Sequence, residues 1–134
     1  MILVDTYVLI DVFDADPQWA AWSGQQLDMW SARGPLLINP VIYAELAADF
    51  ASIDTLDNVI RQAKLELREM PREALYLAGK VHQRYRQRGG NRAGVLSDFF
   101  IGAHAAVLKL PVLTRDTDRY NAYFDGLRLV APDK

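Results

Sequence analysis

Met-Ile-Leu-Val-Asp, at residues 1–5, is a short apolar run with an aspartate directly after it. Four similar apolar runs follow along the chain, and the longer stretches between them have the apolar spacing of helices. This alternation is typical of a parallel sheet covered by helices, so the sequence predicts an α/β fold with a mostly parallel sheet of about five strands. The predicted strands are Ile2–Val4, Leu36–Ile38, Leu65–Met70, Pro111–Thr114 and Arg128–Val130.

Start and stop signals predict where the helices lie between these strands. Typical first residues of helices occur at five places: Asp16-Pro17, Asn39-Pro40, Ser52, Pro71 and Ser97. The first helix is expected to end at Gly34, the fourth at Gly89-Gly90 and the last near Lys109. Residues 89–94 contain three glycines and therefore predict a flexible loop.

Length and composition limit the possible classes of protein. With 134 residues, of which 51% are hydrophobic and 24% charged, the chain has the balance of one globular domain, expected over residues 1–134. It has no cysteine, which excludes disulfides, thiolate metal ligands and cysteine nucleophiles. A net charge of −2 argues against a generally basic nucleic-acid binder but leaves room for a local basic patch. The first residues contain neither a basic leader nor a membrane-length apolar run, so we expect a cytoplasmic protein that does not bind membranes.

Two aspartates follow predicted strands closely. Asp5 comes directly after the first strand, and Asp116 follows Pro111–Thr114 after a single arginine. Because the carboxyl ends of parallel strands meet at one edge of the sheet, where ligands bind, both side chains are expected at that edge.

Two further acids are predicted to join them. Glu45 lies in the helix that Pro40 opens, on a mostly apolar face where a carboxylate needs a partner. Asp98 is expected directly after the predicted cap Ser97, in a helix whose N-terminus points back at the same edge. A simpler interpretation of Asp98 is an acid that complements the helix dipole.

Four carboxylates in one cleft would repel one another unless a cation neutralises them. Mg²⁺ or Mn²⁺ is the natural candidate, because both prefer oxygen ligands and can activate water for attack on a phosphate. The expected reaction is hydrolysis of a phosphodiester without a covalent enzyme intermediate. Asp118, two residues after Asp116, is a possible additional ligand. The spacing leaves open whether one or two ions take part.

Four blocks of sequence occur in a recognisable order: Ile-Leu-Val-Asp-Thr-Tyr-Val-Leu-Ile-Asp at 2–11, Val-Ile-Tyr-Ala-Glu-Leu at 41–46, Leu-Ser-Asp-Phe-Phe-Ile-Gly-Ala-His-Ala at 96–105 and Val-Leu-Thr-Arg-Asp at 112–116. Together they resemble the PIN-domain ribonuclease family, and most closely its VapC-type toxins. The resemblance implies an endoribonuclease that uses Mg²⁺ or Mn²⁺ and cuts RNA. It also implies that the protein is usually a homodimer and is inhibited by a cognate antitoxin protein encoded beside it.

The resemblance also implies roles for single residues. The acidic positions of the family correspond to Asp5, Glu45, Asp98 and Asp116. Thr6 corresponds to a common hydroxyl beside the metal ligands. The chain departs from the family pattern at the next residue, where Tyr7 replaces a small residue that is usually serine. A bulky phenol here is expected to narrow substrate access or to offer a stacking surface.

The densest basic segment lies at the end of the long predicted helix and in the glycine loop: Lys80, Arg84, Arg86, Arg88 and Arg92. Arg84 and Arg88 share one helix face, and with Arg92 in the loop they are expected to contact RNA phosphates. The alternative is an ordinary solvated face.

Other functional interpretations fit the sequence less well. A receiver domain would need an acidic pair before the strand-end aspartate, and an aspartate-nucleophile phosphatase would need a second aspartate where Tyr7 stands. The alternative function is a non-catalytic PIN-like module that binds RNA or protein. Loss of one or more acids would be its mark, and all four are present.

Overall fold

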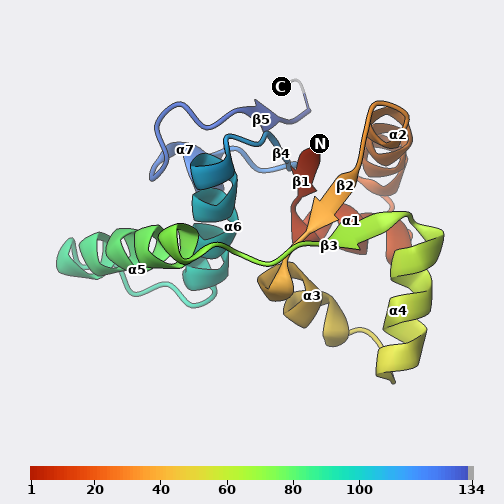
Figure 1. Ribbon diagram of the computed structural model, residues 1–134, viewed down its shortest axis with the longest axis horizontal. Coiled ribbons are helices and arrows are strands. Elements are labelled where there is room, and N and C mark those ends of the chain that lie inside the picture. Colours follow the sequence, from red (N-terminus) through yellow and green to blue (C-terminus); the bar gives the residue numbers. More distant parts are fainter. Residues whose placement is uncertain (133–134) are drawn as a thin grey trace.

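The computed structural model of the chain describes residues 1–132. Within these residues five strands form one sheet in the order β3-β2-β1-β4-β5, and all neighbouring strands are parallel. The α/β class and the parallel sheet expected from the sequence are therefore confirmed. The strands are β1 (Ile2–Val4), β2 (Leu36–Ile38), β3 (Leu65–Leu67), β4 (Val112–Leu113) and β5 (Leu129–Val130) (Figure 1).

The first two strands have the predicted bounds, whereas the other three are shorter. β3 ends at Leu67, and the charged residues Arg68 and Glu69 that follow are exposed. Pairing between β4 and β5 joins only Val112 to Leu129 and Leu113 to Val130. These three predicted strands therefore extend one to three residues too far in total.

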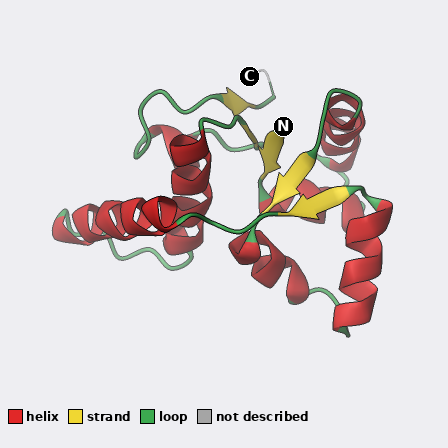
Figure 2. Cartoon of the chain, viewed as in Figure 1, coloured by secondary structure: helices red, strands yellow, loops and turns green. Residues whose placement is uncertain are grey.

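Seven helices lie in the described part of the chain: α1 (Thr6–Phe13), α2 (Ala20–Ser31), α3 (Pro40–Ala47), α4 (Ile53–Gln62), α5 (Arg72–Gln87), α6 (Val95–Leu108) and α7 (Asp118–Asn121). Figure 2 shows α5 and α6 on one side of the strands and α2 and α4 on the other. No predicted helix start corresponds to α1 or α7. Among residues 1–132, no helix has the length and apolar character needed to cross a membrane.

The side chains of three predicted start residues accept backbone N–H groups. The side chains of Asn39 and Ser52 each accept a backbone N–H from the first turn of their helix, at 2.9 and 3.2 Å. Asp16 also accepts two backbone N–H groups, each at 2.9 Å. Those bonds close a separate turn, and the regular helix α2 begins only at Ala20.

The predicted cap at Ser97 is wrong. α6 begins two residues earlier, at Val95, directly after Gly94, whose φ of +80° is readily adopted only by glycine. The Ser97 hydroxyl lies inside the first turn and donates back to the Gly94 carbonyl at 2.9 Å. Asp98 is therefore in the first turn of α6 but is not its first residue.

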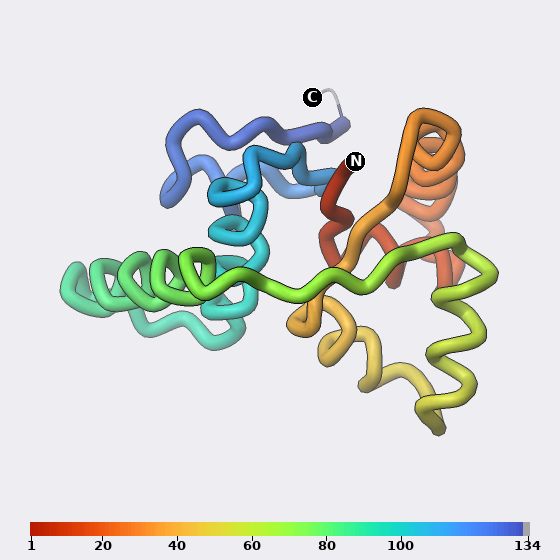
Figure 3. Tube along the Cα trace, in the orientation of Figure 1, coloured from red at the N-terminus to blue at the C-terminus, as the bar shows by residue number. Residues whose placement is uncertain are grey.

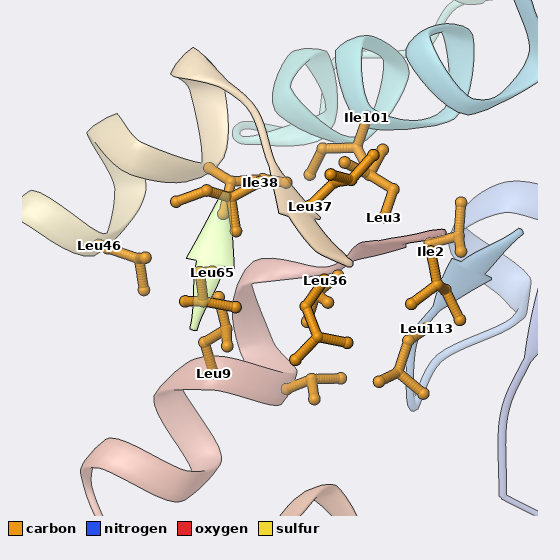
Figure 4. Close-up of a cluster of buried hydrophobic side chains, with 14 of the residues drawn as sticks. Ile2, Leu3, Leu9, Leu36, Leu37, Ile38, Leu46, Leu65, Ile101 and Leu113 are labelled. Atoms are coloured by element: carbon orange, nitrogen blue, oxygen red, sulfur yellow. The ribbon is translucent and has the colours of Figure 1, made fainter. Parts of the chain in front are cut away.

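Aliphatic side chains from the sheet and the flanking helices form the main core (Figure 4). Leu3 and Ile38 from the strands, Leu9 from α1 and Ile101 from α6 are fully buried there. Burial of each such side chain stabilises the fold by about 1.5–3 kcal/mol. This packing fixes the helices against the strands and so determines where the strand ends lie.

A second, smaller core joins α5, α6 and the segment after α7. Its buried members are Ala78, Val81, Val95, Phe99, Ala103 and Phe124. The Phe124 ring packs so closely on Gly102 of α6 that a Cβ at this glycine would lie 2.4 Å from Phe124 Cε2. This core therefore holds α6, which carries Asp98, in a defined position.

The order of the strands creates a reversal in the middle of the sheet. Figure 3 follows the chain from β1 in the centre to β3 at one edge, and then back past β1 to β5 at the other edge. The direction of winding changes between the neighbours β1 and β4. In open parallel sheets, the carboxyl ends of the strands at such a reversal border a crevice in which ligands bind.

Candidate active site

Asp5 and Thr114 lie side by side at this reversal, directly after β1 and β4. The Asp5 backbone N–H donates to the carbonyl of Leu113 at 2.9 Å. The Thr114 hydroxyl donates to Asp5 Oδ2 at 2.8 Å, so side chains also join the two strand ends. Asp5 is only 1% exposed and Thr114 is fully buried. The strand-end acid predicted at position 5 is therefore a buried carboxylate with a fixed orientation.

Asp98 reaches the same place from α6 and shares one arginine with Asp5. Arg119 Nη2 lies 2.5 Å from Asp98 Oδ1, and Arg119 Nε donates to Asp98 Oδ2 at 3.2 Å. Arg119 Nη1 lies 3.6 Å from Asp5 Oδ2. A single guanidinium from α7 thus lies between two buried carboxylates.

Glu45, from α3, is linked to this group through Thr6. The Thr6 hydroxyl donates to Glu45 Oε1 at 2.7 Å, and Thr6 follows Asp5 directly in the chain. Thr6 is buried, whereas Glu45 is partly exposed. The structure therefore brings three of the four predicted acids to one edge of the sheet.

Burial changes the acid–base properties of both aspartates. It raises the pKa of the Asp98 carboxyl to about 6 and also raises the pKa of Asp5. The positive charge of Arg119 opposes both shifts, while neighbouring carboxylates, including Glu45, add to them. Both carboxyl groups thus resist ionisation even beside Arg119. Additional positive charge at this site would therefore stabilise their ionised forms.

Tyr120 is buried next to the same acids. Its hydroxyl has no hydrogen-bond partner of good geometry within residues 1–132. Burial raises the pKa of the Tyr120 phenol well above its ordinary value, and the charges of Asp5 and Asp98 add to this effect. The Tyr120 hydroxyl and the crowded carboxylates together are oxygen donors of the kind that a hard divalent cation prefers.

The fourth predicted acid, Asp116, has an exposed side chain. Its Oδ1 accepts the backbone N–H of Asp118, which is itself exposed at the start of α7, at 3.2 Å. The Asp116 backbone N–H donates at 3.1 Å to the Thr114 hydroxyl, the same group that holds Asp5. Asp116 is therefore tied to the site through its backbone, while its carboxylate faces solvent.

The acids do not form a complete metal-binding group in this arrangement. Among residues 1–132, no three acidic or histidine side chains are close enough to share one ion. Arg119 supplies the positive charge that the sequence interpretation assigned to a divalent metal. The metal ligands Asp5, Glu45, Asp98 and Asp116 therefore stay a prediction.

His104 lies in α6 but faces α3. It is fully buried, and its Nδ1 lies 3.2 Å from Asn39 Nδ2, so the amide donates and His104 Nε2 carries the ring proton. Burial lowers the pKa of His104. Asn39 also caps α3, so this hydrogen bond links the two helices that carry Glu45 and Asp98.

The basic segment borders a different hollow. Arg84 of α5 and Arg88, directly after α5, line a hollow of about 210 Å³ with Asp125, and none of the four predicted catalytic acids lines it. The Arg92 backbone N–H donates to the Tyr85 hydroxyl at 2.8 Å, which holds the glycine loop against α5. RNA contact by these three arginines stays a prediction.

Besides the buried hydroxyls of Thr114 and Tyr120, sequence reasoning missed two ionic features of this site. One is Arg119, and the other is an ion pair between Arg115 and Asp11, whose Nε and Oδ2 atoms lie 2.9 Å apart. The one available signal is that both arginines occur within three residues of the strand-end acid Asp116. No local pattern distinguishes them from exposed arginines, because their partners are far away in the chain.

Comparisons with known proteins agree with this fold. The PIN domain family model matches residues 2–125. A chain of VapBC2 from Rickettsia felis, solved bound to a promoter DNA fragment, has a TM-score of 0.73 and 16% identity, covering 99% of this chain and 100% of that one.

Two other solved structures are similar over nearly their whole length. DNA-bound VapBC from Salmonella typhimurium has a TM-score of 0.71 and 18% identity, with 98% of each chain covered. A toxin–antitoxin complex from Klebsiella pneumoniae has a TM-score of 0.67 and 22% identity, covering 100% of this chain and 99% of that one. The comparison with curated protein sequences gives no match.

Proposed function

The chain belongs to the PIN domain family, and from this premise we propose that it is a metal-dependent endoribonuclease that hydrolyses RNA phosphodiester bonds. One observation carries the proposal: the buried carboxylates of Asp5 and Asp98 lie at the carboxyl edge where the sheet reverses, with Glu45 beside them. Buried acids with raised pKa values at such an edge are typical of catalytic sites.

The proposed ligands of Mg²⁺ or Mn²⁺ are Asp5, Glu45, Asp98 and Asp116, with Asp118 as an additional candidate. When bound, the ion would neutralise the acids, polarise a phosphate oxygen and acidify the attacking water.

The chain itself orients these donors. Thr114 fixes the carboxylate of Asp5, and Thr6 fixes that of Glu45. Arg119 holds Asp98 through two of its nitrogens, so it would compete with a metal ion for these oxygens. In the metal-free protein, Arg119 is thus the counter-ion of the site.

We further propose that the chain is the toxin of a toxin–antitoxin pair, forms a homodimer and is inhibited by a cognate antitoxin. The support is analogy of fold with chains from VapBC and other toxin–antitoxin complexes, together with the family resemblance for the dimer. Co-expression with the product of a short reading frame that adjoins the gene would test the antitoxin partner. A complex that no longer cuts RNA is expected, and cleavage that continues unchanged would contradict it.

One observation favours the alternative, a PIN-like module that binds RNA or protein without cutting. Arg119 contacts the oxygens of Asp5 and Asp98 that a metal ion would need. A module of this kind would bind RNA, but Mg²⁺ and Mn²⁺ would neither stabilise it nor induce cleavage.

The substitution Asp98→Asn tests the proposed function, because it keeps the shape of the side chain and removes its charge. The parent is expected to cut single-stranded RNA with Mg²⁺ or Mn²⁺ and to melt at a higher temperature with metal than in chelator, since a ligand stabilises the state it binds. The variant should lose nearly all cleavage and most of the metal-induced rise in Tm.

The matched control is Asp49→Asn, which changes an exposed acid after α3 and should keep both properties. A parent that binds RNA but shows neither cleavage nor a metal-dependent Tm would support the binding module instead.

A further inference from the structure

A hollow of about 310 Å³ lies beside the acids, lined by Tyr7, Arg115, Asp116 and Arg119. Two of these residues already border the proposed reaction centre: Asp116 is a proposed metal ligand, and Arg119 contacts Asp5 and Asp98. Tyr7 is 42% exposed, so a ligand in the hollow could contact its ring. The hollow is thus continuous with the place where a phosphodiester would react.

Arg115 is held in this hollow by a buried acid. Its Nε donates to Asp11 Oδ2 at 2.9 Å, and the Ser23 hydroxyl donates to the same oxygen at 3.1 Å. Asp11 is 2% exposed and Ser23 is fully buried, so the anchor is rigid. Within residues 1–132 the Arg115 side chain has no hydrogen-bond partner besides Asp11, and 28% of it remains exposed.

Aromatic rings contact the guanidinium groups of both Arg115 and Arg119. The guanidinium carbon of Arg115 lies 5.4 Å from the ring centroid of Tyr7 and 5.4 Å from that of Trp19. The guanidinium carbon of Arg119 lies 4.7 Å from the Tyr7 ring. Cation–π contacts of this kind limit the movement of a guanidinium without using its hydrogen-bond donors.

We infer that this hollow is a phosphate subsite for the RNA strand beside the cleavage position, with Arg115 as its principal donor. The inference rests on the proposed function. A guanidinium fixed through one nitrogen can present its remaining N–H groups to a phosphate, and its planar fork matches phosphate oxygens. Arg119 uses all three of its nitrogens on Asp5 and Asp98, whereas Arg115 uses only Nε on Asp11, which leaves Arg115 with N–H groups for a phosphate.

The carboxylate of Asp116 also lines the hollow and would repel a phosphate. Its Oδ1 is engaged by the Asp118 backbone N–H. In the proposed function a metal ion would neutralise its charge, and in chelator that charge weakens RNA binding alike in the parent and in every variant compared with it. Asp11 has a separate role in this subsite, because it is a positioning residue that acts through Arg115. Tyr7, the departure from the family pattern, belongs to the same group of contacts.

Binding of a fluorescein-labelled single-stranded RNA, followed by anisotropy in chelator so that no strand is cut, tests the inference. Arg115→Gln is expected to weaken binding about tenfold, the effect of one lost charge-assisted hydrogen bond. The salt dependence of log Kd should become shallower by about 0.7, because one fewer phosphate is neutralised on a single strand. Affinity for Mn²⁺ should not change.

Two further variants identify the role of Asp11. Asp11→Asn should weaken RNA binding less than Arg115→Gln does, and it should have no additional effect in a chain that already carries Arg115→Gln. Arg115→Lys keeps the charge but not the planar fork, and should give an intermediate affinity even if the glutamine variant folds poorly. The control is Arg61→Gln, an exposed arginine of α4 that should leave binding unchanged.

The outcomes separate this inference from the proposed function. If the parent cuts RNA but Arg115→Gln and Arg115→Lys bind it as the parent does across the salt series, the hollow is not a phosphate subsite. If the parent neither binds nor cuts RNA with Mg²⁺ or Mn²⁺, the proposed function itself is wrong, and the inference is wrong with it.

Discussion

At the level of single residues, a cation within a group of acids determines how strongly that group binds other cations. Arg119 contacts Asp98 through two nitrogens and Asp5 through a third. A metal ion would need the same oxygens, and two cations in one place repel each other. Arg119 should therefore stabilise the metal-free protein and at the same time compete with metal.

Replacing Arg119 with glutamine is expected to change these two properties in opposite directions. In chelator, the free energy of unfolding should fall by about 1–3 kcal/mol, less than for a fully buried pair because 17% of the side chain is exposed. Affinity for Mn²⁺, measured by titration calorimetry, should rise because the competing charge is gone. Arg115→Gln is the control, since its ion pair is with Asp11. Weaker Mn²⁺ binding by the Arg119 variant would mean that Arg119 positions the acids for metal.

His104 makes the stability of the fold sensitive to pH. Burial lowers its pKa in the folded protein, whereas in the unfolded chain it titrates near 6.5. Below pH 6.5 the unfolded chain therefore binds more protons at this position, and the contribution of His104 to stability falls as pH falls.

His104→Gln should remove this dependence, because an amide can still accept from Asn39 and does not titrate. Relative to the variant, the parent should lose up to about 1.4 kcal/mol of unfolding free energy between pH 7.5 and 5.5, measured by urea denaturation. A difference that stays constant with pH would show that His104 is not held neutral. The comparison with the variant matters because the raised pKa values of Asp5 and Asp98 act in the opposite direction.

At the level of elements, apolar runs predicted the strands well, and terminal residues were the main source of error. The runs at Ile2–Val4 and Leu36–Ile38 are buried throughout and have charged or turn-forming residues nearby, so their limits are clear in the sequence. The start of α6 was misplaced because Ser97 is a common cap residue, whereas the helix begins after Gly94 in a left-handed conformation. A positive φ at glycine depends on the path of the loop, which a local pattern does not reveal.

Two glycines in neighbouring helices should respond oppositely to alanine. Gly102→Ala in α6 places a Cβ 2.4 Å from the buried Phe124 ring, and the overpacking should destabilise the fold by about 1–3 kcal/mol. Gly79→Ala in α5 meets nothing within 4 Å and should stabilise the fold by about 0.5–1 kcal/mol, because alanine loses less backbone entropy. Thermal melts of both variants test this. Equal effects would mean that Phe124 moves aside without penalty.

At the level of the whole molecule, topology explains how much of the site was predictable. Asp5 could be assigned to the binding edge because parallel strands all end at that edge, and Thr114 and Asp5 meet there although they are 109 residues apart. Arg119 and the Arg115–Asp11 pair could not be assigned. Their contacts depend on how α7 and the end of β4 approach α1 and α6, and neither periodicity nor capping encodes that approach.

If the proposed function is correct, one RNA strand should contact two separate basic places. The hollow beside Arg84 and Arg88 shares no lining residue with the hollow beside Arg115, so each would bind a different phosphate. Replacing Arg84 and Arg88 with glutamate should weaken RNA binding and flatten its salt dependence, while the metal-induced rise in Tm persists.

Combining Arg84→Glu and Arg88→Glu with Arg115→Gln tests whether both places bind one strand. The logarithms of the losses in affinity should add, because substitutions at separate sites without shared partners act independently. Anisotropy titrations of the parent, the Arg84/Arg88 variant, the Arg115 variant and the combined variant supply all four values at each salt concentration. A combined variant no weaker than the Arg115 variant would mean that the strand does not reach α5. Unchanged binding by the Arg84/Arg88 variant over the whole salt series would identify that helix face as solvated surface.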